Sequence, residues 1–212
     1  ASFPKRGGYP YEIRVHESAL AEARSKLEVL KYPDTPDGSV VEVSSATRIC
    51  FIDRGRTNLL RRGTRFRVFR HGKAGEMIPT GQIEVRQVHD TRAECGILSM
   101  TDELNPIAPG DFIAAPNYDP KQEREFVLEG RFPTGYSKAM VADRLRSLGA
   151  RVADTVSPRT DFLILGDAEQ EGLEMDDEGG ADPRETENFR MAQLYKAQVL
   201  PVREILEFVR FD

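Results

Sequence analysis

The chain has 212 residues, of which 39% are hydrophobic and 31% charged, and its net charge is −5. This composition can bury the core of one large domain or two small ones. It has no apolar run near the roughly 18 residues that a membrane span needs, and no signal peptide opens it. It begins with Ala1 rather than Met, as a fragment of a longer protein would. We therefore expect a cytoplasmic protein with no membrane partner.

The net charge conceals a strong asymmetry along the chain. Residues 1–123 carry 18 Lys and Arg against 17 Asp and Glu, whereas residues 124–212 carry 12 against 18. Nine basic residues and one acid lie between positions 48 and 73, and ten acids and one base between positions 167 and 187. These two segments are opposite in charge, and we expect them to attract each other within a chain or between chains.

Residues 1–33 are expected to form an N-terminal helix that ends at Tyr32-Pro33, because a residue before proline avoids the helical conformation. Two heptads place apolar residues at their a and d positions. These residues are Leu20, Ala23, Leu27 and Leu30. The pattern fits either the end of a coiled coil, which would make the chain a homo-oligomer, or an amphipathic helix packed on its own domain.

Residues 39–118 show period-2 alternation typical of β-strands, interrupted by turn residues and without helices. Six short strands in this arrangement favour a small closed β-barrel. The expected strands are 39–45, 47–52, 64–70, 81–88, 92–98 and 111–115. The side chains expected to point inward are Val41, Val43, Phe66, Val68, Ile83, Val85, Cys95 and Ile97.

Two further features belong to this barrel. Cys50 and Cys95 both lie in strand-like stretches and are expected to be buried free thiols, with a disulfide as the alternative. The segments 63–70, 83–85 and 106–111 resemble a small barrel of flagellar assembly and other bacterial accessory proteins.

After residues 117–122, the best domain boundary, strands alternate with helices, which indicates a parallel sheet covered on both faces. Gly149 is expected to stop the first helix, and Asp182, Pro183 and Glu185 to form the start of the second. The expected strands are 126–128, 151–156, 162–165 and 199–202. The expected helices are 138–148, 182–197 and 204–211.

Residues 124–212 resemble a BRCT domain, closest to the single BRCT domains of bacterial NAD-dependent DNA ligases and clamp-loader large subunits. The segments that carry the resemblance are Phe126-Val-Leu-Glu-Gly130, Leu148-Gly149-Ala150, Val152, Thr155-Val-Ser-Pro-Arg-Thr-Asp-Phe-Leu-Ile-Leu-Gly166, Val199-Leu-Pro-Val202 and Phe208. The resemblance implies a four-stranded parallel sheet with three helices. It also implies a role in protein–protein interaction in repair or replication assemblies.

The resemblance also defines a candidate phosphate pocket. Phosphate-binding BRCT domains place Ser or Thr before the Gly that closes the first strand, and basic residues on the first and second helices. Here Gly130 is the closing Gly and Lys138 and Arg190 match the basic positions, but Glu129 stands where the hydroxyl should be. A carboxylate there would repel phosphate. Thr134 and Ser137 in the next loop are possible substitutes for the hydroxyl.

Two charged segments have open interpretations. The acidic loop 167–181 fits either a solvated insertion or an electrostatic mimic of nucleic acid that lies on a basic partner. Seven arginines of the barrel fit either a solvated strand face or a basic face that binds nucleic acid directly. They are Arg54, Arg56, Arg61, Arg62, Arg65, Arg67 and Arg70.

Nothing in the sequence indicates catalysis. The three histidines, His16, His71 and His89, are scattered, and two cysteines cannot build a structural zinc site. A P-loop, a G-x-G-x-x-G, a G-x-S-x-G and the K-x-D-G of nucleotidyl-transferring ligases are all missing from the sequence. We expect a protein-binding scaffold that is not an enzyme and uses no cofactor or metal. Direct nucleic-acid binding and coiled-coil oligomerisation are the alternatives.

Overall fold

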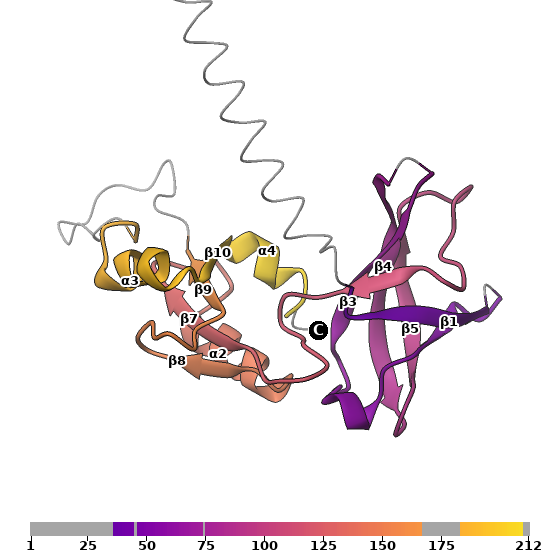
Figure 1. Ribbon diagram of the computed structural model, residues 1–212, viewed down its shortest axis with the longest axis horizontal. Helices are drawn as coiled ribbons and strands as arrows, with labels where there is room; N and C mark the ends of the chain where they lie inside the picture. The colour runs from indigo at the N-terminus through magenta and orange to yellow at the C-terminus, as the bar shows by residue number, and fades with distance from the viewer. Residues whose placement is uncertain (1–35, 45, 74, 167–182, 210–212) are drawn as a thin grey trace, which may run out of the picture.

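The computed structural model describes residues 36–44, 46–73, 75–166 and 183–209. The expected N-terminal helix, the acidic loop 167–181 and the capping residue Asp182 lie outside these ranges. Two units follow each other along the chain, a barrel unit and a C-terminal unit with a parallel sheet (Figure 1). The expected fold class, an all-β barrel followed by an α/β unit, is confirmed.

The barrel unit is a closed, antiparallel barrel of six strands, joined in the order β1-β2-β5-β4-β3-β6 and closed by pairing of β1 with β6. The strands are β1 (Gly38–Ser44), β2 (Ile49–Ile52), β3 (Arg65–His71), β4 (Met77–Val88), β5 (Ala93–Met100) and β6 (Phe112–Ala114). One short 3-10 helix, η1 (Arg56–Asn58), follows β2 and was not expected.

The barrel core follows the predicted alternation with one exception. Phe66, Val68, Ile83 and Val85 are almost completely buried, as are Cys95 and Ile97 on β5. Val41, however, is 56% exposed, and Val40 is buried in its place. The cause is a β-bulge between Val40 and Glu42, which changes the face that each side chain meets. The expectation for Val41 was therefore wrong, and Val43 is only partly buried.

Cys50 and Cys95 face each other on β2 and β5, and both are buried free thiols, as predicted. The hydrogen bond between the two side chains and burial both raise the pKa of Cys95. Cys95 therefore stays protonated and acts as part of the hydrophobic core.

The C-terminal unit contains a four-stranded, wholly parallel sheet in the order β10-β9-β7-β8. Its strands are β7 (Glu125–Glu129), β8 (Arg151–Ala153), β9 (Phe162–Leu165) and β10 (Gln198–Pro201). Its helices are α2 (Lys138–Ser147), α3 (Glu187–Tyr195) and α4 (Val202–Leu206). The expected four strands and three helices are therefore present.

Helices cover both faces of this sheet because adjacent residues of a strand point to opposite sides. Phe126 and Leu128 of β7 pack in a cluster with Leu145 of α2 and Ile205 of α4. Val127, between them, packs in a second cluster with residues of α3. The central strand β7 is thus buried on both sides.

Both later helices differ from their predicted bounds. Thr186 caps α3, because its hydroxyl accepts from the Phe189 amide at 3.3 Å and donates to the Pro183 carbonyl at 2.9 Å. The helix therefore begins at Glu187, several residues after the predicted start. The helix α4 ends at Leu206, which leaves Phe208 beyond it rather than on it.

The two units are joined by a buried charge cluster around Arg67 of β3, next to α4, which Figure 1 shows between the sheet and the barrel. The Arg67 guanidinium lies 2.8 Å from Glu204 and 2.7 Å from Glu207. Its carbon Cζ also lies 4.8 Å from the centre of the Phe208 ring, and Phe208 packs into the barrel core. Burial lowers the pKa of Arg67, but the hydrogen bonds to the two carboxylates outweigh it and raise the pKa overall.

We predict that Arg67→Ala lowers the free energy of unfolding by about 3 kcal/mol, because it removes the buried guanidinium that pairs with the two partly buried carboxylates. Urea denaturation followed by circular dichroism measures the change. The control is Arg56→Ala. Both side chains of the Arg56–Asp90 ion pair are exposed, so this substitution should change the free energy of unfolding by less than about 1 kcal/mol. Equal effects of the two substitutions would contradict the structural role of Arg67.

Candidate functional site

The predicted phosphate pocket lies where the central strands β7 and β9 end together. The order β10-β9-β7-β8 makes this the switch point of the sheet, since the chain continues from β7 towards β8 on one side while β9 lies on the other. Crevices at such points are the usual ligand sites of parallel sheets. Here the two ends are close: the Gly166 amide donates to the Glu129 carbonyl at 2.8 Å, and a Cβ at Gly166 would clash with the Arg131 backbone.

Glu129 is held at this end of the sheet by Asn188 of α3. The Asn188 Nδ2 donates to Glu129 Oε2 at 2.7 Å and to the Asp154 carbonyl at 3.1 Å, and its Oδ1 accepts from the Val156 amide at 3.0 Å. One side-chain amide thus fastens the end of β7 to the loop after β8. Asn188 was not predicted from the sequence, since a lone Asn in the first turn of a helix has no distinguishing signal.

The structure brings some of the other predicted pocket residues to the same end of the sheet. Gly130 closes β7 with φ of +80°, a conformation that favours glycine. The hydroxyl of Ser137 caps α2 by accepting from the Met140 amide at 3.1 Å, so one of its lone pairs is already used. Lys138 opens α2, and Thr134 lies exposed in the loop before it.

Arg190 lies on α3, against the opposite face of the sheet from α2. Both Lys138 and Arg190 are exposed. Within the ranges that the structure describes, neither forms an ion pair with Glu129, which accepts from Asn188 instead. The Glu129 carboxylate therefore lies at the position that the resemblance assigns to a hydroxyl.

The seven arginines of the expected basic face do not share one solvated face. Arg65 and Arg67 are both 7% exposed and are paired with Glu84 and with Glu204 and Glu207 respectively. Arg70 pairs with the buried Asp111 at 2.8 Å. The expectation of a single solvated seven-arginine face was therefore wrong, because Arg65 and Arg67 are buried and they, like Arg70, pair with acids of the protein.

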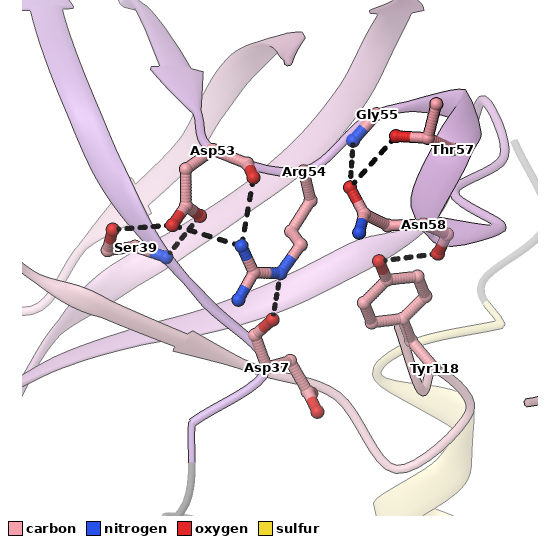
Figure 2. A network of polar contacts seen from close by, with 8 residues as sticks. All are labelled: Asp37, Ser39, Asp53, Arg54, Gly55, Thr57, Asn58 and Tyr118. Carbon is pink, nitrogen blue, oxygen red and sulfur yellow. Dashed lines mark hydrogen bonds and ion pairs between the residues drawn. The ribbon is translucent and has the colours of Figure 1, made fainter. Parts of the chain in front are cut away.

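Arg54 belongs to a polar network at the base of the barrel (Figure 2). Its guanidinium donates to the Asp37 carbonyl and lies 3.0 Å from the Asp53 carboxylate, which also accepts from the Ser39 amide at 2.7 Å. In the same view, the Tyr118 hydroxyl donates to the Asn58 carbonyl at 2.8 Å. The network ties the start of β1, the turn after β2 and the chain that leads to the C-terminal unit.

The remaining three arginines, Arg56, Arg61 and Arg62, line a pocket of about 640 Å³ between the barrel unit and α2. Arg86 of β4, which was not predicted, is a fourth arginine of the lining. The rest of the lining is Leu60, Gln87, Val88 and Ser147. Sequence alternation could have shown that Arg86 points out of the barrel, but not that it meets Arg61 and Arg62.

No family model matches the chain. It is similar to part of the DNA ligases of Clostridium botulinum: those of the Langeland and Okra strains are 28% identical over 94 residues, and that of the Hall strain is 27% identical over 94 residues. The similarity covers 43% of this chain, and it spans 14% of the length of those ligases.

The solved structures found are distant. A ferredoxin NADP+ reductase of Neisseria gonorrhoeae with bound FAD and NADP has a TM-score of 0.27 and 11% identity, over 62% of this chain and 57% of that one. An NADH-dependent reduced ferredoxin-NADP oxidoreductase has a TM-score of 0.23 and 19% identity, over 80% and 57%. Scores this low carry no argument.

Two features are absent from the described parts of the chain. None of their helices is both long and apolar enough to cross a membrane. No group of three or more His, Cys, Asp or Glu within them could hold a metal ion.

The base of the barrel should make stability depend on pH. Burial raises the pKa of Asp37 to about 7 from 3.8, against the lowering effect of the hydrogen bond from the Ala115 amide. The folded state therefore holds a proton that the unfolded state releases, and this group's contribution to stability is lost as the pH rises from about 4 to about 7.

We predict that Asp37→Asn, which mimics the protonated form, matches wild type near pH 4 and is more stable at pH 8. The gain should be on the order of 1.4 kcal/mol for each pKa unit of the shift. Urea denaturation across this pH range measures it, with Asp143→Asn on the exposed side of α2 as the control. If the free energy of unfolding of Asp37→Asn depends on pH in the same way as that of wild type, the raised pKa of Asp37 is not the cause of the pH dependence.

Proposed function

We propose that the chain is a non-catalytic interaction module of a DNA-associated assembly, and that its BRCT-like C-terminal unit binds another protein without needing a phosphate. The observation that carries this proposal is the Glu129–Asn188 hydrogen bond of 2.7 Å at the end of the central strand. It supports a phosphate-independent mode, because the BRCT resemblance assigns a hydroxyl to the position that this carboxylate holds.

The parallel sheet, its three helices and the similarity to DNA ligases support the BRCT-like part of the proposal. The association with DNA rests on those ligases and on the residues that resemble the repair and replication family. The joint at Arg67 supports a scaffold role, because two units that share a buried ion cluster present their surfaces in a fixed relation.

An affinity capture from the native cell extract tests the proposal. The immobilised chain is exposed to untreated extract, to extract treated with nuclease and to extract treated with phosphatase. We expect the same protein partner in all three. Loss of the partner after nuclease would mean that nucleic acid mediates the contact, and loss after phosphatase would overturn the phosphate-independent mode.

The role of Glu129 yields a sharper prediction. Wild type should show no saturable binding of a library of phosphoserine and phosphothreonine peptides, because the Glu129 carboxylate repels the phosphate near Lys138 and Arg190. Glu129→Thr removes the charge and supplies a hydroxyl, and should gain measurable affinity in fluorescence polarisation.

Glu129→Gln is the matched control, since it removes the charge, keeps an acceptor for Asn188 and adds no hydroxyl. We expect its affinity to lie between those of wild type and Glu129→Thr. Wild type could instead bind a phosphopeptide with micromolar affinity and fail to bind the same peptide without its phosphate. That result would show that Glu129 does not block the pocket.

A further inference from the structure

We propose that the pocket lined by Arg56, Arg61, Arg62 and Arg86 binds the phosphodiester backbone of duplex DNA. This inference goes beyond the proposed protein-binding function and does not depend on it. The pocket is separate from the site at Glu129, because its walls are η1 and its following loop, the end of β4, and the last residue of α2.

The first argument is uncompensated charge. The guanidinium groups of Arg61, Arg62 and Arg86 have no acidic partner among the described residues, and Arg56 alone is paired, with Asp90 at 3.0 Å. Elsewhere in the barrel the arginines Arg54, Arg65, Arg67 and Arg70 each have a carboxylate. Like charges gathered in one pocket repel each other, and a bound anion relieves that repulsion.

The second argument is that the fold makes room for these side chains. Arg86 crosses over Gly96 of β5, and any Cβ there would collide with its guanidinium. Arg61 lies over Gly149, where a Cβ would be 2.6 Å from its Nε. Gly149 follows α2, and the helix carbonyl ends favour a cation nearby. The helix end accounts for the position of Arg61 but leaves Arg62 and Arg86 without an internal role.

The chemistry of the lining selects the ligand. Guanidinium groups bind phosphate oxygens with two parallel hydrogen bonds, and the Ser147 hydroxyl and Gln87 amide add neutral donors. Among the described residues, the lining contains no aromatic side chain on which an unpaired base could stack. Its apolar part, within the same ranges, consists of Leu60 and Val88. The pocket is therefore suited to backbone phosphates, without reading the sequence of bases.

Fluorescence anisotropy with a labelled DNA duplex over a salt series tests the proposal on the full chain. Wild type should bind with an affinity that falls steeply with salt. Arg62→Ala combined with Arg86→Ala should weaken binding about tenfold or more at low salt, and reduce the slope of log K against log salt by about 0.9 for each lost phosphate contact.

The matched control is Lys121→Ala combined with Arg159→Ala, which removes the same charge from exposed positions outside the pocket. Its salt slope should equal that of wild type, and thermal unfolding should show that both double variants are folded. An equal loss in the control would overturn the proposal, because binding would then follow net charge only.

Two further arms identify the ligand. Single-stranded DNA should bind no more tightly than the duplex, and inorganic phosphate should displace the duplex no better than chloride at equal ionic strength. Preference for the single strand, or binding of phosphate without binding of duplex, would overturn the assignment. The variant Glu129→Thr should retain wild-type affinity for DNA, so a failure here leaves the protein-capture result unaffected.

Discussion

The arrangement of the two units depends on the burial of a single positive charge, that of Arg67. A guanidinium that is 7% exposed is costly unless carboxylates satisfy it, and those carboxylates come from the far end of the chain. Glu204 lies on α4 and Glu207 just after it, so their ion pairs require α4 to lie against β3.

Phe208 then enters the barrel core, and the C-terminal unit contributes a core residue to the barrel. The two units therefore share part of their stability, although their sequence patterns change abruptly near residue 120.

This joint also explains why the alternation of β3 misleads. The pattern correctly places Phe66 and Val68 inside the barrel, and correctly points Arg67 outward. A side chain that points out of the barrel from β3 is not exposed to water at this position, because the outer face of β3 meets the C-terminal unit. Contacts separated by 137 and 140 residues leave no trace in a local pattern. Charge composition over a window of the sequence therefore cannot distinguish an arginine that holds two units together from one that binds a ligand.

Much of the fold could be predicted because it depends on local periodicity. The six barrel strands and the four parallel strands follow from alternation and turn residues, and β9 has the predicted bounds. The predictions fail where a single hydrogen bond sets the start of a helix, or where a single register shift sets which strand residues are buried. Thr186 rather than Asp182 sets the start of α3, and a bulge between Val40 and Glu42 leaves Val41 exposed. Of the candidate site, Glu129 and Gly130 could be placed from the resemblance, but Asn188 and Arg86 could not, because their importance depends on neighbours distant in sequence.

The acidic net charge of the protein does not conflict with the phosphate-binding role proposed for the arginine-lined pocket. Charges in solution are screened over about 8–10 Å at ordinary ionic strength, so a phosphate at the pocket responds mainly to groups within that distance. A net charge of −5 summed over 212 residues is then a poor guide to the local potential. The barrel arginines with internal carboxylates contribute little net field, whereas Arg61, Arg62 and Arg86 contribute fully because no described acid pairs with them.

The pocket is lined by residues of both units, with Ser147 from α2 and the arginines from the barrel. Its shape therefore depends on the joint that Arg67 makes, so this buried arginine helps to position the exposed arginines of the pocket.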